Sequence, residues 1–305
     1  MQIYLPVAEL SLNVLLLAGI GLAIGFLSGM FGVGGGFIMT PLLIFLGVPS
    51  AVAVGTGASQ IVAASVSSAV GHWRRGNIDM LMGYFLIGGG VFGAITGVKI
   101  VYTLKQLGQL DLFVSLTYVI LLGVIGALML IESVRTLRAG PTRPGGSARR
   151  AGQHTWIQRL PLKQRFPHSK LYISAIPPIA IGAFVGWLTA IMGVGGGFVM
   201  VPAMIYLLGM PTMVVPGTSL FQIIFVSATV TILQAINNRT VDLVLALLLL
   251  VGGVIGAQFG TRMATRLRGE QLRIMLAVLI LAVAIKLTFD MTATPDHLYS
   301  AAFIQ

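Results

Sequence analysis

Two copies of a glycine-rich motif carry the chemistry that this sequence offers most clearly. The first copy runs Gly32-Val-Gly-Gly-Gly36, and the second runs Gly193-Val-Gly-Gly-Gly197. Each copy stands where one apolar helical pattern stops and a short one begins. Four glycines in five positions disfavour a helix, since each costs about 1 kcal/mol relative to alanine. The motifs therefore predict two broken helices whose second parts begin with free N–H groups, and such helix starts attract anions.

A second pair of candidate anion contacts lies further along each half. The segments 55–60 and 217–222 read Gly-Thr-Gly-Ala-Ser-Gln and Gly-Thr-Ser-Leu-Phe-Gln. They resemble helix starts, because Thr and Ser hydroxyls cap free backbone N–H groups. Four such helix starts that meet near the membrane midplane would form a transporter's substrate site. The alternative is that the glycines only allow tight turns and close helix packing. The candidate substrate-binding residues are Gly32, Gly34, Gly35, Gly36, Thr56, Ser59, Gln60, Gly193, Gly195, Gly196, Gly197, Thr218, Ser219 and Gln222.

Four polar residues interrupt apolar runs at equivalent positions of the two halves. They are Gln60 with Gln222 and Ser65 with Ser227. Polar groups that face lipid are costly, so these side chains are expected to face the protein interior. Lining a pathway and holding helices together remain equally good explanations.

Other polar residues have simpler interpretations. Asp79 and Asp242 each open a helix, and N-capping explains them better than a proton relay does. Lys99 and Arg262 lie near the ends of equivalent helices, where snorkelling to the membrane interface is preferred to balancing substrate charge. His72 belongs to an interfacial cluster at a helix end.

The elements that position these residues are apolar segments of membrane-spanning length. The chain is 56% hydrophobic and 9% charged, whereas soluble domains carry about 25% charged residues. Two short runs, 37–46 and 198–208, cannot cross a bilayer alone. The long segments, each near the roughly 20 residues that span a bilayer, are 12–30, 51–70, 81–101, 112–131, 173–192, 213–236, 243–260 and 272–289.

Glycines at four-residue spacing occur in several of these segments. This small-xxx-small pattern lets membrane helices approach closely. The glycines concerned are Gly21, Gly25 and Gly29, then Gly89, Gly93 and Gly97, and finally Gly252, Gly256 and Gly260.

An internal repeat organises the chain. Residues 25–41 match residues 186–202. Further along, Gly55-Thr56 matches Gly217-Thr218, and the glycines of 89–97 match those of 252–260. We interpret residues 1–132 and 172–305 as two transmembrane repeats joined by a basic linker, 133–171. Five apolar segments in each half are an odd number, so the halves are expected to be inverted in the membrane.

Arginine placement supports this topology, because short cytoplasmic loops are enriched in Lys and Arg. With the linker in the cytoplasm and five crossings per half, Arg74 and Arg75 lie inside, as do the basic residues of 262–273. Lys99, Lys105 and Arg239 fall outside. Both termini are then expected outside.

Several function classes are excluded or disfavoured. The net charge is +11, but nine of the 19 basic residues lie in 133–170, which holds no Asp or Glu. That distribution indicates an orienting loop rather than a nucleic-acid surface. No zinc-protease, nucleophile-elbow, P-loop or dinucleotide-binding motif is present, and the chain has no cysteine. We therefore expect no enzymatic activity, no cofactor and no bound metal.

With both copies of Gly-Val-Gly-Gly-Gly-Phe-x-Met-x-Pro in view, the chain resembles the sulfite exporter TauE/SafE family, also called the TSUP family. The resemblance covers about residues 12–289 without the linker, and it includes Pro41 and Pro202 after the glycine motifs. It implies a multi-pass transporter of the bacterial inner membrane. The family's cargo is small sulfur-containing anions such as sulfite, sulfoacetate, other organosulfonates or thiosulfate. Ser59, whose counterpart is Phe221, departs from symmetry, so the two sides of the pocket are expected to differ.

The expected activity is secondary transport, with export as the family's direction and an ion gradient, of protons first, as the energy source. A passive anion channel and a non-transporting subunit of a membrane assembly are the alternatives. The anion, the direction, the coupling ion and the oligomeric state are not fixed by the sequence. The lipid bilayer is the expected surrounding, and no nucleic acid is expected as a partner.

Overall fold

The computed structural model of the chain describes residues 2–138, 161–264 and 269–292. The first half contains β1 (Gln2–Leu5), β2 (Leu10–Asn13), α1 (Val14–Phe31), α2 (Gly36–Phe45), α3 (Ser50–Trp73), α4 (Met80–Gln106) and α5 (Leu110–Arg138). The second half repeats this order with β3 (Lys163–Phe166), β4 (Leu171–Ser174), α6 (Ile176–Met192), α7 (Gly197–Tyr206), α8 (Val215–Leu233), the π-helix η2 (Gln234–Asn238), α9 (Leu243–Ala264) and α10 (Gly269–Thr292). The predicted all-α membrane fold, with five helical segments in each half, is confirmed.

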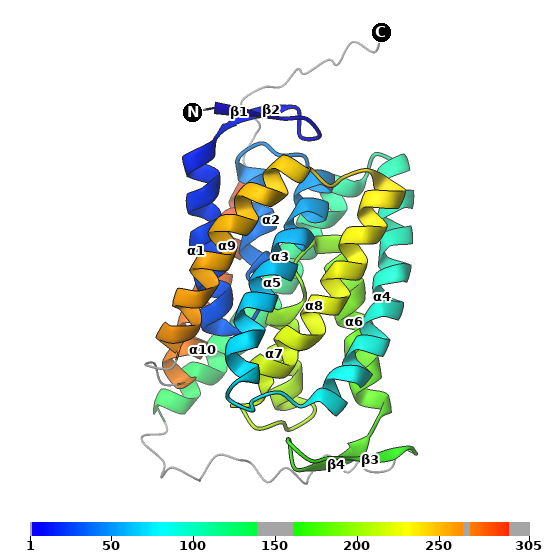
Figure 1. The fold of residues 1–305 in the computed structure, drawn as a ribbon, viewed down its shortest axis with the longest axis vertical. Helices are drawn as coiled ribbons and strands as arrows, with labels where there is room; N and C mark the ends of the chain where they lie inside the picture. Colours follow the sequence, from blue (N-terminus) through cyan, green and yellow to red (C-terminus); the bar gives the residue numbers. More distant parts are fainter. Residues whose placement is uncertain (1, 139–160, 265–268, 293–305) are drawn as a thin grey trace.

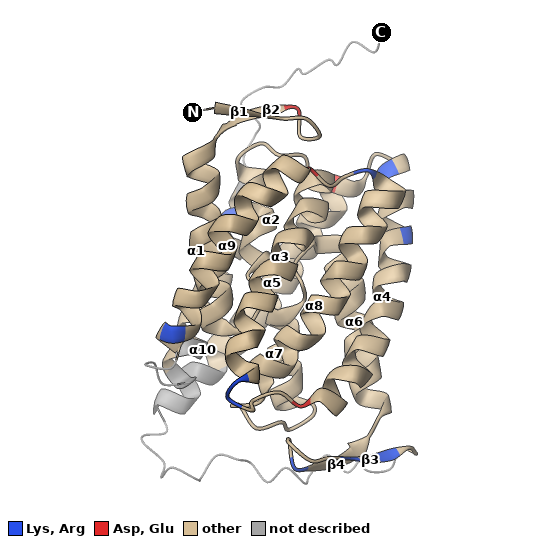
Figure 2. Cartoon of the chain, in the orientation of Figure 1, with Lys and Arg blue, Asp and Glu red and all other residues tan. Residues whose placement is uncertain are grey.

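The helices have the length and surface that a membrane requires. Within the described ranges, α1, α3, α4, α5, α9 and the combined segment of α8 and η2 are long and apolar enough to cross a bilayer. Nearly all charged residues lie at the two ends of the bundle, as Figure 2 shows. Large apolar side chains such as Phe92 and Leu128 point outward, with 67% and 62% of their surface exposed. A surface of exposed apolar side chains between two charged ends suits contact with lipid rather than with water.

Equivalent elements of the two halves start from opposite ends of the bundle (Figure 1). Hairpin β1–β2 and the start of α1 lie at one end, whereas β3–β4 and the start of α6 lie at the other. The predicted linker residues 140–159 and the basic residues Arg266 and Arg268 lie outside the described residues. The inversion of the repeats and the membrane side that each end faces stay predictions.

The two halves are joined by glycine-lined helix crossings. Helix α1 packs along α9, and α6 packs along α4. A methyl group on Gly25 would lie 2.1 Å from the carbonyl oxygen of Gly253, and one on Gly186 would lie 2.0 Å from that of Gly90. Since no side chain fits at such distances, the backbones touch directly. The predicted role of the glycine spacing in close helix packing is confirmed.

Two short β-hairpins were not expected from the sequence. In each, a four-residue strand pairs antiparallel with the next one, Leu5 opposite Leu10 in the first and Phe166 opposite Leu171 in the second. The second hairpin includes the last residues of the segment that we interpreted as a linker. Each hairpin precedes the first helix of its half, so the repeat extends further toward the N-terminus than the motif comparison indicated.

The predicted helix start at Gly55 is wrong. Helix α3 begins at Ser50, so Thr56, Ser59 and Gln60 lie inside it. Gly55 has a different reason to be glycine, because a methyl group there would lie 2.8 Å from the Thr240 hydroxyl oxygen. In the second half the prediction is close, since α8 begins at Val215 and Thr218 is in its first turn.

Candidate functional site

The glycine motifs break the helices as predicted. Helix α1 ends at Phe31, where Gly32 adopts a left-handed conformation with φ 68°, and α2 begins at Gly36 after Gly35 with φ 70°. In the second copy, Gly193 and Gly196 have φ 67° and 68°. These are conformations that residues with a Cβ rarely adopt. The N–H groups of the first two residues of α2 and of α7 have no acceptor within their own helix, whereas those of Ile38 and Val199 donate to the carbonyl oxygens of Gly35 and Gly196. The local geometry for anion binding is therefore confined to the first two N–H groups of each short helix.

The two broken loops lie against each other in the centre of the molecule. A methyl group on Gly36 would lie 2.5 Å from the Val194 carbonyl oxygen, and one on Gly197 would lie 2.1 Å from that of Val33. The rings of Phe37 and Phe198, which follow the motifs, have their centroids 5.9 Å apart. The structure therefore brings the two motifs together in one packed contact.

Isoleucines from α3 and α8 close this contact from the side. Ile61 would be 3.3 Å from a methyl group on Gly34 and 2.8 Å from one on Gly195. Ile223 would be within 3.5 Å of both such groups. Helices α3 and α8 therefore carry their Gln-Ile pairs at the point where the two glycine motifs meet.

A hydroxyl from α8 also reaches the first motif. Ser219 donates a hydrogen bond to the carbonyl oxygen of Gly32 at 2.9 Å. Its counterpart in α3 is Gly57, which has no side chain to offer to Gly193. Ser59 instead donates to the Thr56 carbonyl oxygen of its own helix at 2.6 Å. The two halves therefore differ at a second position besides Ser59 and Phe221, while a difference between the two sides of a substrate pocket stays a prediction.

The four polar residues that interrupt the apolar runs of α3 and α8 are among the buried side chains without a protein partner in the described part of the chain. Gln60 and Gln222 have both carboxamide atoms without a hydrogen bond, and the hydroxyls of Ser65 and Ser227 are likewise unpaired. All four residues are fully buried. Leaving a buried polar atom unsatisfied costs about 1–3 kcal/mol. None of the four bonds to a neighbouring helix in the structure, so no hydrogen bond supports the interpretation as structural glue, and lining a pathway stays a prediction.

Glycine niches in the opposite half receive the two carboxamides. A methyl group on Gly253 would lie 2.3 Å from the Gln60 amide nitrogen, and one on Gly90 would lie 3.0 Å from that of Gln222. Gln60 therefore projects toward α9, and Gln222 projects toward α4. Gly90 and Gly253 thus also leave room for two polar side chains at the border between the halves.

Gly35 and Gly196 pack tightly against the helix that precedes each motif. A methyl group on Gly35 would lie 2.8 Å from the Ile24 side chain and 2.9 Å from the Ile24 carbonyl oxygen, and one on Gly196 would lie 2.1 Å from Val185. Alanine at either position would therefore disturb the packing on α1 or α6, whatever its effect on a ligand. These two glycines are poor probes of anion binding, and the glutamines are better ones.

One residue close to the second motif was not among the predicted site residues. Tyr118 of α5 is fully buried and donates its hydroxyl to the Met192 carbonyl oxygen at 2.7 Å, at the end of α6. A tyrosine inside an apolar helix was the available signal, because a buried phenol needs a hydrogen-bond partner. Tyr118 fixes the position at which α6 gives way to the glycine loop.

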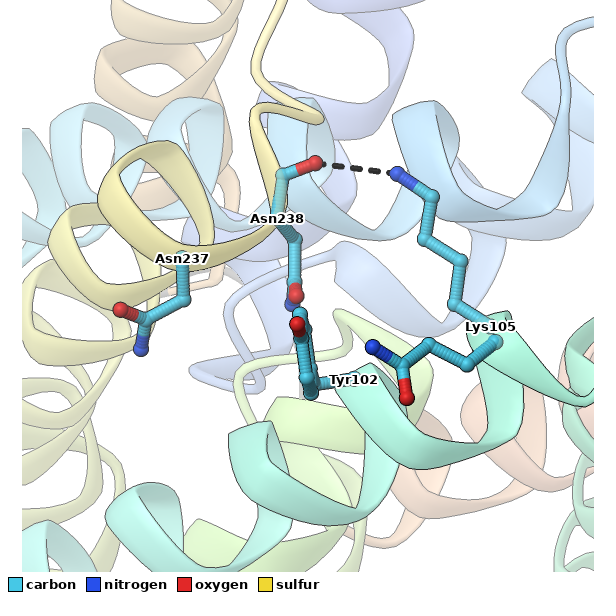
Figure 3. A pocket seen from close by; sticks show the side chains of 5 residues that line it. Tyr102, Lys105, Asn237 and Asn238 are labelled. Atoms are coloured by element: carbon cyan, nitrogen blue, oxygen red, sulfur yellow. Dashed lines mark hydrogen bonds between the residues drawn. The ribbon is translucent and has the colours of Figure 1, made fainter.

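A pocket of about 290 Å³ lies away from the predicted site, between the ends of α4 and η2. Figure 3 shows Lys105 donating to the Asn238 carbonyl oxygen at 3.0 Å. Tyr102, Gln106 and Asn237 complete the lining. None of the predicted substrate-binding residues lines this pocket. The lysine satisfies a carbonyl at a helix end, which is a common structural role.

The chain is similar to one known family over most of its length. A sequence profile described as "Sulfite exporter TauE/SafE" matches residues 17–287. A "Probable membrane transporter protein" of Xylella fastidiosa (strain 9a5c) is 28% identical over 271 residues, which cover 88% of this chain and 92% of that protein. The "Probable membrane transporter protein YjnA" of Bacillus subtilis (strain 168) is 28% identical over 270 residues, 88% of this chain and 96% of its own. A second B. subtilis protein, named YunE, is 26% identical over 288 residues, 92% and 98% of the two chains. No solved structure matches the chain.

Proposed function

The chain belongs to the sulfite exporter TauE/SafE family, and on that premise we propose that it is a secondary transporter that exports small sulfur-containing anions across the bacterial inner membrane. Sulfite, sulfoacetate, other organosulfonates and thiosulfate are the substrate class. The gradient of an ion, of protons first, supplies the energy. Its relatives carry transporter names, so a catalytic role has no support.

The observation that carries this proposal is the pair of unpartnered glutamines beside the glycine motifs. Gln60 and Gln222 are buried, symmetric and without hydrogen bonds among the described residues. A sulfite or sulfonate group presents three oxygens that accept hydrogen bonds. Carboxamide N–H groups, serine hydroxyls and the free N–H groups of α2 and α7 are donors suited to it.

The neutrality of these donors matters for transport. A lysine or arginine at the centre would hold an anion tightly and slow its release. Carboxamides, hydroxyls and backbone amides bind an anion through dipoles, so the site can load and unload without separating a buried ion pair. Such a site suits a carrier that must release its cargo in every cycle.

The packed centre favours a carrier over a channel. The glycine loops touch each other, and Ile61 and Ile223 lie beside them. We infer that an anion reaches the amides when the two halves move relative to each other. Movement of one repeat against another around a fixed site is the expected mechanism for this architecture.

Counterflow in proteoliposomes tests the proposal. Purified protein is reconstituted with unlabelled sulfite, thiosulfate or sulfoacetate inside, and uptake of the labelled anion is followed. Stimulation by the anion on the opposite side is expected of a carrier. Flux without that stimulation would identify a passive channel, and absence of both flux and anion-dependent stabilisation would identify an assembly subunit.

A matched pair of variants connects the flux to the site. Gln222→Met removes the polar head from α8 at nearly constant volume, and flux should fall at least about tenfold if one strong hydrogen bond to the anion is lost. Thr229→Val on the exposed side of the same helix removes only an intrahelical bond to Phe225, so flux should persist. Equal flux in both variants would remove Gln222 from the site.

A further inference from the structure

The two hairpins occupy equivalent positions in the repeat and opposite ends of the bundle (Figure 1). Their turns are built alike, because Glu9 and Lys170 both have positive φ, 55° and 51°. In each hairpin the last residue of the first strand is buried. Leu5 and Phe166 are 0% and 1% exposed. Each hairpin therefore presents one large buried apolar side chain, here called the plug residue, to the helices beneath it.

The plug residues contact the region between each short helix and the helix that follows it. Leu5 belongs to an apolar cluster with Leu43 of α2 and Val48 in the loop before α3. Phe166 belongs to the equivalent cluster with Met204 of α7 and Leu208 in the loop before α8. Each hairpin thus covers the outer end of one broken-helix unit.

A buried aspartate from the opposite half holds the first hairpin. Asp242 Oδ2 accepts hydrogen bonds from the N–H groups of Val7 at 2.9 Å and Ala8 at 3.4 Å, both in the hairpin turn. Its other oxygen, Oδ1, accepts from Val244 and Leu245 and so caps α9. Oδ1 therefore caps the helix, and Oδ2 holds the hairpin.

Asp79 holds the second hairpin in the same way. Its Oδ2 accepts from the Ser169 backbone N–H at 3.0 Å and from the Ser169 hydroxyl at 2.5 Å. Its Oδ1 accepts from Met82 N–H at 3.1 Å and caps α4. The division between the two oxygens is repeated, and each aspartate again belongs to the half opposite its hairpin.

Each aspartate is also bonded to a residue of the proposed site. The N–H of Asp242 donates to the Thr56 hydroxyl oxygen, and the N–H of Asp79 donates to that of Thr218, both at 3.0 Å. A path therefore runs from each hairpin to α3 or α8 through one buried aspartate, whose carboxylate accepts from the hairpin and whose backbone N–H donates to the threonine. A movement of the hairpin reaches the helices that carry the glutamines.

We propose that the two hairpins are lids over the two mouths of the transport pathway, each latched by the aspartate of the opposite half, and that one lid is released at a time. This inference rests on the proposed transport function. A two-stranded hairpin is only marginally stable by itself, so its position depends on the latch and on its apolar contacts with the helices, those of the plug side chain foremost. Both latches are closed in the structure, which accords with its packed centre.

The split use of the carboxylate oxygens allows a selective test. In Asp242→Asn, the remaining oxygen can still cap α9, but the amide group that replaces Oδ2 cannot accept from Val7 and Ala8. Amide hydrogen exchange followed by mass spectrometry should then accelerate on the order of tenfold or more in the peptide that contains residues 2–13. The peptide that contains residues 163–174 should stay protected. Asp79→Asn should give the reverse pattern, so each variant is the control for the other.

The accessibility of the pathway provides the second readout. A cysteine at half-buried Ser59 is the only thiol in the chain, because the natural sequence has none. A membrane-impermeant maleimide should label it faster from the β1–β2 side in Asp242→Asn and from the opposite side in Asp79→Asn. Unchanged hairpin exchange would overturn the latch, and faster exchange without changed labelling would overturn the lid.

Neither readout requires flux, so failure of the lids is distinguishable from failure of the transport proposal. Should Asp79→Asn not fold, Ser169→Ala removes one hydrogen bond to the same oxygen without altering the helix cap. It should release the β3–β4 hairpin in the same direction but by a smaller factor. Native exchange in Ser169→Ala and in Asp242→Asn would refute the latch.

Discussion

Replacing Gln222 by methionine should make the anion-free protein more stable and its anion complex weaker. Both carboxamide atoms are buried without a partner, and an unsatisfied buried polar group costs about 1–3 kcal/mol. Methionine is similar in length, so the cost of repacking stays below about 1.5 kcal/mol. The net stabilisation is on the order of 1 kcal/mol, which raises Tm by about 1–2 °C for a chain of this size.

The loss on the binding side follows from linkage. An anion present at about 100 times its Kd stabilises the native protein by about 2.7 kcal/mol. A tenfold loss of affinity reduces that gain to about 1.4 kcal/mol, so the anion-dependent shift in Tm should fall by about half. Thermal unfolding of monodisperse protein in detergent, with and without the best anion, measures both quantities.

Gln234 provides the matched control. It is as deeply buried, but its amide nitrogen donates to the Ala190 carbonyl oxygen at 3.2 Å and its oxygen accepts from Asn238. Gln234→Met should therefore lower Tm, because it leaves those partners unpaired. If Gln222→Met lowered Tm as well and kept the full anion shift, Gln222 would be a packing residue and the pathway interpretation would be wrong.

Three further predictions concern the fold and its orientation. Gly25→Ala should lower Tm, because its methyl group would lie 2.1 Å from the carbonyl oxygen of Gly253 and overpacking costs about 1–3 kcal/mol. Gly19→Ala in the same helix should not lower Tm, because nothing lies close to Gly19. Equal Tm values for the two variants would refute the backbone contact. A cysteine replacing Arg239 should react with an impermeant maleimide only from the outside of intact cells, whereas labelling only from the cytoplasm would exclude the inverted topology. Deletion of residues 140–159 should preserve counterflow, and a correctly inserted deletion variant without flux would give that segment a part in transport.

Local patterns were sufficient to predict the helices and the glycine breaks. Four glycines in five residues mark Gly32–Gly36 and Gly193–Gly197 as loops, because a helix there lacks intrinsic support. The acidic residues Asp79 and Asp242 stand one position before apolar helices, and the structure confirms that both are N-caps. These features depend on neighbours within a few residues, which a sequence displays directly.

The same reasoning could not find what depends on distant partners. The pattern around Gly55 predicted a helix start, yet Gly55 lies inside a helix and its missing side chain leaves room for Thr240, which is far away in the chain. The second role of Asp242 could not be predicted either, because its hydrogen bond to the hairpin joins residues 235 positions apart. One signal was available but unused: Leu5-Pro6 with Leu10 repeats as Phe166-Pro167 with Leu171, so the repeat could have been extended to the hairpins.

The pairing of α1 with α9 has a consequence for biosynthesis. Val7 and Asp242 are 235 residues apart, and at roughly 5–20 residues per second the ribosome needs about ten to fifty seconds to produce the second after the first. Throughout that interval the glycine face of α1 is in or near the bilayer without the backbone that will cover it. Helix α4 likewise waits for α6, though for a shorter time. Neither repeat can therefore complete its own packing, and the nascent N-terminal half must remain an open, loosely associated set of helices until the C-terminal half has entered the membrane.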